Sequence, residues 1–275
     1  MDPRTIVDAV IEEHRLQPVD MLGNGAAAGE YKYLVCLRDS FVHTVQDVDA
    51  LLGGNRQGCS ILEIGSFLGV VSVTLKRMGY EVNAVDIPEF HQSQALRGLY
   101  ERNGVPFGGV NLRAARLPFD DRRFDAVVAC EVMEHLNFNP LPAVREINRV
   151  LKPGGYFYLG MPNQASLANR LNLLRGRSVR NPVDDFFRQL DRRDNMVVGL
   201  HWREYTLSET VELIGRMGFE RARAYFFISD SSSNPLKGLV KKLAYAYPPF
   251  RPFHVVIGRN VAEPSHDFWV TDANS

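Results

Sequence analysis

The sequence predicts an α/β fold: a seven-stranded, mostly parallel sheet with helices on both faces and an antiparallel last strand. Short apolar runs such as residues 61–64 and 82–85 have the length and composition of buried parallel strands. Segments with helical spacing of apolar residues separate these runs, which is typical of strands joined by helices. A glycine-rich turn after the first run and an acid closing the second indicate a ligand site at the ends of these strands.

Length and composition favour an ordinary globular protein. The 275 residues suit one large α/β domain or a domain with a small elaboration. Hydrophobic residues make up 45% and charged residues 23%. Lys+Arg and Asp+Glu are equal at 32 each, so no global field favours nucleic acid or an anionic membrane. We therefore do not expect nucleic acid as a partner.

The three cysteines, Cys36, Cys59 and Cys130, are odd in number and widely spaced. They are interpreted as reduced thiols of a cytoplasmic protein. The acidic, amphipathic N-terminus is unlike a signal peptide. No apolar run approaches the roughly 20 residues that span a bilayer. We expect a soluble protein without an integral membrane segment; the sequence leaves its oligomeric state open.

The first 55 residues are predicted to form a helical cap. Residues 4–16 have helical spacing behind Asp2-Pro3, residues 23–29 are a linker of small residues, and residues 31–52 predict one or two helices ending at Gly53-Gly54. The main domain is expected over residues 56–260, and residues 261–275 are expected to be a flexible tail.

Residues 60–89 form the unit around which the chain is organised. The strand at residues 61–64 leads through the turn from Gly65 to Gly69 into a helix that Gly79 closes, and the second strand ends on Asp86. The glycines let the backbone turn tightly near a ligand, and the acid can accept hydrogen bonds from ribose hydroxyls. The spacing differs from the G-x-G-x-x-G of dinucleotide-binding proteins.

The pattern Glu63-x-Gly65-x-Phe67-x-Gly69 resembles motif I of the class I S-adenosylmethionine (SAM) methyltransferases, usually acid-x-Gly-x-Gly-x-Gly. Phe67 departs from it where glycine is usual, so its side chain must lie beside the cofactor or turn outward. The resemblance implies a Rossmann-like domain that binds SAM. From this unit it implies these cofactor contacts: Glu63, Gly65, Ser66, Phe67, Gly69, Asp86 and Ile87.

The next segments extend the resemblance. A helix over residues 91–103 and a short strand at 110–113 precede L-P-F at 117–119 and F-D-A-V-V-A-C at 124–130, which resemble the family's loop before strand four and strand four itself. The acid that family members often carry before L-P-F is missing, so apolar and backbone contacts are expected to hold adenine. The resemblance places Ala115, Leu117 and Cys130 at the cofactor.

The remaining elements complete the expected fold. Residues 142–151 are helical, 152–155 a helix stop and tight turn, and 156–161 the fifth strand. An acceptor-binding insertion is expected at about 164–205, with helices at 165–174 and 184–194. Thr206 caps a helix to residue 217. A strand to residue 228, a helix at 235–245 and a last strand at 253–257 follow.

The best candidate for chemistry is Glu131-Val132-Met133-Glu134-His135, because ligands of such sheets bind at the carboxyl ends of strands. On one helical turn, Glu131, Glu134 and His135 would share a face. With His201 they would bind a divalent cation, Mg, Mn or Zn. E-x-x-E-H with a distant histidine is similar to metal-using ubiquinone-type O-methyltransferases and small-RNA terminal 2′-O-methyltransferases.

Two alternatives to the metal stay open. Glu131 and Glu134 could cap a helix N-terminus while His135 is an ordinary half-buried histidine. His135 or His201 alone could serve as general base, with Glu131 as a further catalytic candidate. The resemblance implies methyl transfer from SAM to a hydroxyl of a small molecule or a sugar in a glycan. The alternatives are a metal-dependent RNA 2′-O-methyltransferase, a non-catalytic SAM-binding scaffold and an NAD-dependent dehydrogenase.

Overall fold

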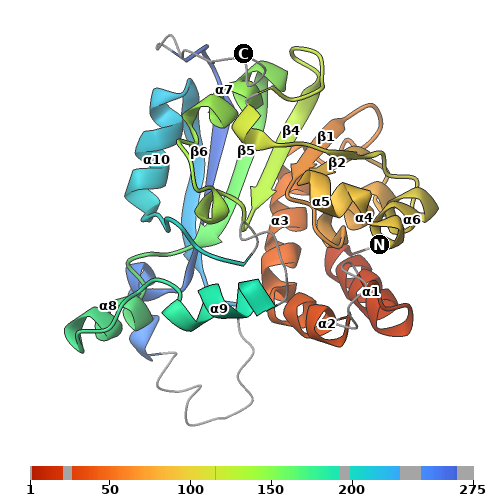
Figure 1. Cartoon of the computed structure of the whole chain (residues 1–275). Coiled ribbons are helices and arrows are strands. Elements are labelled where there is room, and N and C mark those ends of the chain that lie inside the picture. Colours follow the sequence, from red (N-terminus) through yellow and green to blue (C-terminus); the bar gives the residue numbers. More distant parts are fainter. Residues whose placement is uncertain (1, 21–26, 115, 192–198, 230–242, 265–275) are drawn as a thin grey trace.

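The computed structural model describes residues 2–20, 27–114, 116–191, 199–229 and 243–264. It contains a seven-stranded sheet of order β3-β2-β1-β4-β5-β7-β6, in which β7 runs antiparallel to both neighbours (Figure 1). The strands are β1 Ser60–Ile64, β2 Glu81–Asp86, β3 Phe107–Gly109, β4 Phe124–Cys130, β5 Leu151–Pro162, β6 Phe219–Phe227 and β7 Phe253–Asn260. The predicted fold class, with its antiparallel last strand, is confirmed.

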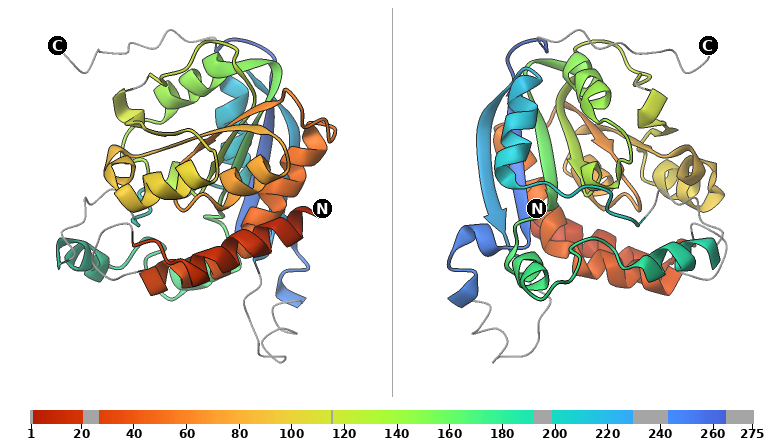
Figure 2. Two further views of the ribbon diagram at one scale, coloured as in Figure 1. Left: turned by 90° about the vertical axis from the view of Figure 1, so that its right-hand side faces the viewer. Right: turned by 60° about the vertical axis from the view of Figure 1, so that its left-hand side comes forward.

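Helices cover both faces of the sheet (Figures 1 and 2). Side chains alternate along each strand, so that Ile61 and Val128 enter one core while Leu62 and Val127 enter the other. The first core includes side chains of α1, α3, α4 and α6, and the second those of α7 and α10. The helices are α1 Pro3–Leu16, α2 Ala27–Cys36, α3 Arg38–Leu51, α4 Val70–Arg77, α5 Pro88–Gln92, α6 Gln94–Arg102, α7 Leu141–Val150, α8 Leu167–Leu174, α9 Val183–Asp191 and α10 Leu207–Arg216.

Three predicted elements are wrong in detail. The third strand is at Phe107–Gly109 rather than 110–113, because Gly109 lets the chain pass close to α5: a Cβ there would lie 2.9 Å from Cβ of His91. The helix over 91–103 is two helices, since Ser93 leaves helical geometry and caps α6 by accepting from the Leu96 amide. Residues 151–155 belong to β5.

Other predictions are confirmed or fall outside the described residues. Thr206 caps α10 in a reciprocal capping box with Glu209. Most of the 23–29 linker, the helix at 235–245 up to residue 242, and the tail from 265 lie outside the described residues. Within the described part of the chain, no helix combines the length and apolar character needed to cross a membrane.

The N-terminal helix α1 is joined to the rest of the fold by polar contacts as well as by its apolar face. His14 is buried and its Nε2–H donates to the carbonyl of Leu68, 2.9 Å away, in the turn before α4. Arg38 of α3 donates twice to the carboxylate of Asp8 on α1, at 2.5 and 2.7 Å. The glycine-rich turn is therefore supported from outside by α1.

Candidate active site

The turn between β1 and α4 brings two loops into contact. Gly65 and Gly69 have φ of +71°, a region that favours glycine. A Cβ on Gly65 would lie 2.3 Å from Cγ2 of Val132, which follows β4. A Cβ on Gly69 would lie 3.1 Å from the Tyr100 ring. Both glycines are thus required by backbone conformation and by close packing.

Phe67, at the position where the family usually has glycine, also has a positive φ, +46°. Its backbone N–H donates to Oδ2 of Asp86 at 2.7 Å. Its ring meets Tyr33 of α2 edge-on, with centroids 5.6 Å apart, and lies 5.9 Å from the Phe90 ring. The ring therefore packs against α2 and α5, and its contact with the cofactor stays a prediction.

Asp86, the acid expected to bind ribose, lies at the end of β2 and is held by two backbone amides. Oδ1 accepts from the Ile87 amide at 2.7 Å and Oδ2 from the Phe67 amide. Burial raises the pKa of Asp86 to about 6, although these two hydrogen bonds favour the carboxylate. Each oxygen keeps a lone pair for a further donor. The site therefore fits the ribose of SAM, and the cofactor contacts of Asp86 and Ile87 stay predictions.

Two other predicted cofactor contacts are held inside the protein. Ser66 is buried and its hydroxyl accepts from Tyr100 Oη at 2.8 Å. Glu63 is buried beneath α4 and accepts a hydrogen bond from the Ser72 hydroxyl. The hydrogen bonds of these two side chains hold the turn against α6 and α4. Their contact with a cofactor stays a prediction.

Glu63 should make stability depend on pH. Burial raises the pKa of Glu63 from 4.5 to about 8, so between these values the folded chain holds a proton that the unfolded chain has released. The free energy of unfolding should then fall as pH rises, by up to about 1.4 kcal/mol per pH unit. In urea unfolding measured across the window, Glu63→Gln should make this slope shallower by up to about 1.4 kcal/mol per pH unit, while the raised pKa values of Asp86, Glu131 and Glu134 leave a residual slope. Glu81→Gln, at an exposed position of β2, is the control and should keep the full slope; an unchanged slope in Glu63→Gln would contradict the assignment.

The region expected to hold adenine contains an acid that the sequence did not reveal. Leu117 is 2% exposed, and its amide donates to Oε2 of Glu146 on α7 at 2.9 Å. The sequence has no acid just before L-P-F. The fold instead places Glu146, which is 29 residues after Leu117, next to the Leu117 amide. Ala115 lies outside the described residues. Cys130 has Sγ 3.3 Å from the Thr44 hydroxyl on α3.

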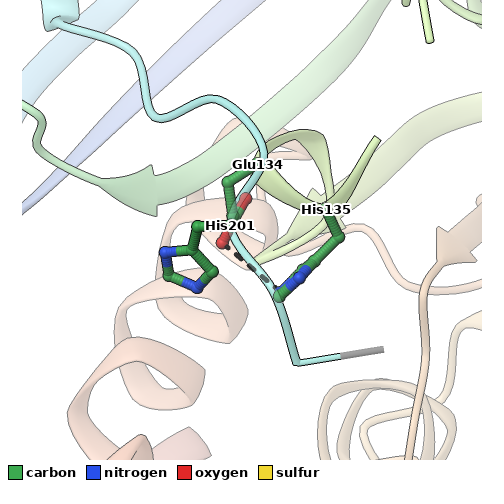
Figure 3. Close-up of side chains that lie close together, drawn as sticks. All are labelled: Glu134, His135 and His201. Atoms are coloured by element: carbon green, nitrogen blue, oxygen red, sulfur yellow. Dashed lines mark ion pairs between the residues drawn. The ribbon is translucent and has the colours of Figure 1, made fainter. Parts of the chain in front are cut away.

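Three of the four candidate metal ligands converge after β4. One ligand atom each from Glu134, His135 and His201 lies within 4.8 Å of the other two (Figure 3). Glu134 and His135 belong to a short 3₁₀ turn, Met133–His135, instead of the α-helical turn expected. Glu131, the fourth candidate, has φ of +55° and lies outside the group. We call Glu134, His135 and His201 the acid–histidine group.

Hydrogen bonds fix both imidazoles of this group. Nδ1 of His135 lies 2.9 Å from the Leu200 carbonyl, which can only accept, so Nδ1 carries the proton and Nε2 a lone pair. Nδ1 of His201 lies 2.8 Å from Oε1 of Glu204. Burial lowers the pKa of His135 to about 4. Burial lowers the pKa of His201, but the hydrogen bond to Glu204 and the charges of Glu134 and Glu204 together outweigh burial, so the net shift is upward.

The carboxyls of Glu131 and Glu134 are buried without adequate partners. Neither oxygen of Glu134, nor Oε1 of Glu131, has a hydrogen-bond partner of good geometry among the described residues. Burial and mutual repulsion raise the pKa of Glu131, and burial raises that of Glu134. At Glu134 the backbone carbonyl accepts from the Trp202 amide at 2.7 Å. The helix-capping interpretation leaves these carboxyl oxygens unexplained; a cation would satisfy them.

Glu204 and Asn169 are site residues that sequence reasoning missed. Glu204 accepts from His201 through Oε1 and from Asn169 Nδ2 of α8 through Oε2, at 3.1 Å. The signal was available in the spacing, because an acid three residues after a histidine can orient its ring. The inserted helix α8 is thereby linked to the acid–histidine group.

Comparisons with known proteins agree with this architecture. A family model described as a methyltransferase domain matches residues 62–159. The ubiquinone biosynthesis O-methyltransferase of Xanthomonas oryzae pv. oryzae is 30% identical over 112 residues, covering 40% of this chain and 46% of that protein. A probable S-adenosylmethionine-dependent methyltransferase of Mycolicibacterium smegmatis is 29% identical over 163 residues, covering 59% and 52%. The chain thus spans about half the length of these curated relatives.

Solved structures share the fold at low sequence identity. A SAM-dependent methyltransferase from Thermotoga maritima has a TM-score of 0.53 and 19% identity, covering 88% of this chain and 99% of that one. Phosphoethanolamine N-methyltransferase 2 of Haemonchus contortus, in complex with SAM, has a TM-score of 0.54 and 16% identity, covering 89% and 60%. The sheet order, the methyltransferase domain match over residues 62–159 and the relatives together support a class I SAM-dependent methyltransferase.

Proposed function

We propose that this protein transfers the methyl group of SAM to a hydroxyl of a small molecule or of a sugar in a glycan. The observation that carries the proposal is the acid–histidine group at the carboxyl end of β4, beside the turn that resembles motif I. Relatives named O-methyltransferases support oxygen as the acceptor atom. A cytoplasmic location, suggested by the cysteines, belongs to the same proposal.

We further propose that Glu134, His135 and His201 hold a divalent cation. Two imidazoles with oriented rings and a carboxylate that lacks hydrogen-bond partners among the described residues are a donor set for such an ion, and the nitrogen ligands favour Mn or Zn over Mg. A bound cation would lower the pKa of an acceptor hydroxyl. Leu200 and Glu204 would hold the two imidazoles in the ligating tautomer.

The two histidines differ as candidate general bases. With a pKa of about 4, His135 is a weak base at neutral pH. His201, whose pKa is raised and whose Nδ1 is held by Glu204, is the better base if the reaction proceeds without a metal. SAM supplies a methyl group on a good leaving group, so much of the rate can come from aligning the acceptor oxygen.

The other functions considered have less support. The methyltransferase domain match removes the reason to consider an NAD-dependent dehydrogenase. A non-catalytic scaffold gives no reason to keep buried carboxyl oxygens of Glu131 and Glu134 without hydrogen-bond partners in the described part of the chain, beside two oriented histidines. The balance of 32 cationic and 32 acidic residues disfavours an RNA 2′-O-methyltransferase.

Calorimetric titration tests the proposal. SAM and S-adenosylhomocysteine, titrated into protein stripped with a chelator, should bind with micromolar affinity, and Mn or Zn should bind separately. The metal signal should disappear in His135→Ala and His201→Ala, while SAM binding persists. SAM binding without any metal response would leave His201 as a base. Absence of SAM binding would exclude the methyltransferase proposal itself.

A further inference from the structure

Large apolar side chains are exposed on two neighbouring segments, α8 and the chain before β7. Exposed fractions are 61% for Leu173 and 83% for Leu174 on α8, and 71% for Leu243 and 58% for Tyr247 on the segment before β7. The two segments lie side by side in both figures, and Arg170 of α8 lies over the Phe250 ring at 5.6 Å (Figures 1 and 2). We call Leu173, Leu174, Leu243 and Tyr247 the α8 patch.

The two stretches of chain that supply the patch are cationic. Residues 164–183 contain four arginines and no acid, and residues 231–252 contain three lysines, one arginine and no acid. They hold eight of the 32 cationic residues and none of the 32 acids. A chain that is neutral overall therefore has a local excess of positive charge in the sequence segments that supply its exposed apolar side chains.

We infer that the α8 patch docks on an anionic lipid surface. Leucines and a tyrosine that can enter the headgroup region, flanked in the sequence by arginines and lysines that can pair with anionic headgroups, are the composition of interfacial membrane segments. A scattered exposed leucine needs no explanation, but this group coincides with a charge excess of one sign. Single-stranded nucleic acid fits less well, because its bases stack on aromatic platforms and three of the four patch residues are leucines.

The patch lies at the edge of the sheet where the site is. In Figure 1, α8 and the segment at 243–250 lie beyond the carboxyl ends of β4 and β5. Asn169 of α8 donates to Glu204, which in turn holds His201. Docking would hold α8 and the acid–histidine group close to the lipid surface. Access of a lipid-embedded acceptor rests on the proposed function; docking itself does not.

Flotation of the full-length protein with vesicles tests the inference. Vesicles of phosphatidylcholine mixed with phosphatidylglycerol should bind the protein, and phosphatidylcholine alone should bind it much less. The double variants Leu173→Glu/Leu174→Glu and Arg175→Glu/Arg177→Glu should each weaken binding by roughly tenfold or more. The matched controls are Leu16→Glu, at a leucine 65% exposed on α1, and Arg216→Glu on α10; both should bind as the unaltered protein does.

The outcomes separate docking from catalysis. No binding to anionic vesicles, equal binding to both vesicle types, or equal loss in the control variants would overturn the inference. Displacement of vesicles by a mixed-sequence RNA that binds more tightly would also overturn it in favour of nucleic acid. SAM titration of the same variants should be unchanged, so failure of the proposed function would appear there and failure of docking only in flotation.

Discussion

Replacing His201 by alanine is expected to lower the rate of methyl transfer by about a hundredfold or more, with SAM affinity unchanged. The substitution removes one of three converging ligand atoms and leaves the buried Glu134 carboxyl with one potential partner fewer. The turn between β1 and α4, where SAM is proposed to bind, lies outside this group. SAM binding should therefore persist. Single-turnover rates together with SAM titration measure the two effects separately.

A graded variant and a control sharpen this expectation. Glu204→Gln keeps an acceptor for the Nδ1–H of His201 but removes its charge, so a smaller loss of about tenfold to a hundredfold is expected. His43→Ala removes a half-buried histidine of α3 that contacts Phe227, outside the group, and should leave the rate unchanged. A full rate in His201→Ala would show that the acid–histidine group does not act in catalysis.

Gly65→Ala should destabilise the protein by about 2–4 kcal/mol and weaken SAM binding. The φ of +71° is strained for alanine, at a cost of about 1–2 kcal/mol. The added Cβ would also lie 2.3 Å from Cγ2 of Val132, an overlap that only movement of one loop relieves, at about 1–3 kcal/mol. Urea unfolding measures the first effect and calorimetry the second.

Two further variants divide this cost into its parts. Gly58→Ala has a similar φ, +75°, but no atom within 4 Å of the new Cβ, so it should show the backbone strain alone. In the double variant Gly65→Ala/Val132→Ala the overlap is removed and only the strain should persist. If Gly58→Ala and Gly65→Ala lower the free energy of unfolding equally, the overlap with Val132 contributes nothing to the destabilisation.

The fold was largely predictable because its central strands are set by local sequence. The apolar run at 61–64 and the run closing on Asp86 are buried on both faces, so nothing but a parallel strand suits them. β3 was misplaced because Phe107-Gly108-Gly109 has little intrinsic strand preference. Its conformation comes from pairing with β2 at Ala84 and from close approach to α5, neither of which sequence periodicity can show.

The candidate site was predictable in its residue types and less so in its geometry. Glu134, His135 and His201 were identified from E-x-x-E-H and a later histidine, and the fold brings them together. Glu131 is separated from them by its left-handed backbone conformation, which no spacing rule anticipates. The partners of the group come from distant elements: Leu200 from the far end of the insertion and Asn169 from α8.

The bond from His14 to the Leu68 carbonyl bears on how this protein can be engineered. It joins α1 to the turn that precedes α4, and Val7, Val10 and Ile11 of α1 lie in the same apolar core as Val73. A truncation at residue 55 would expose that core and leave the Leu68 carbonyl without its donor. The N-terminal helices therefore cannot be replaced as an independent unit. A chimera carrying a relative's N-terminus would need matching changes in α4.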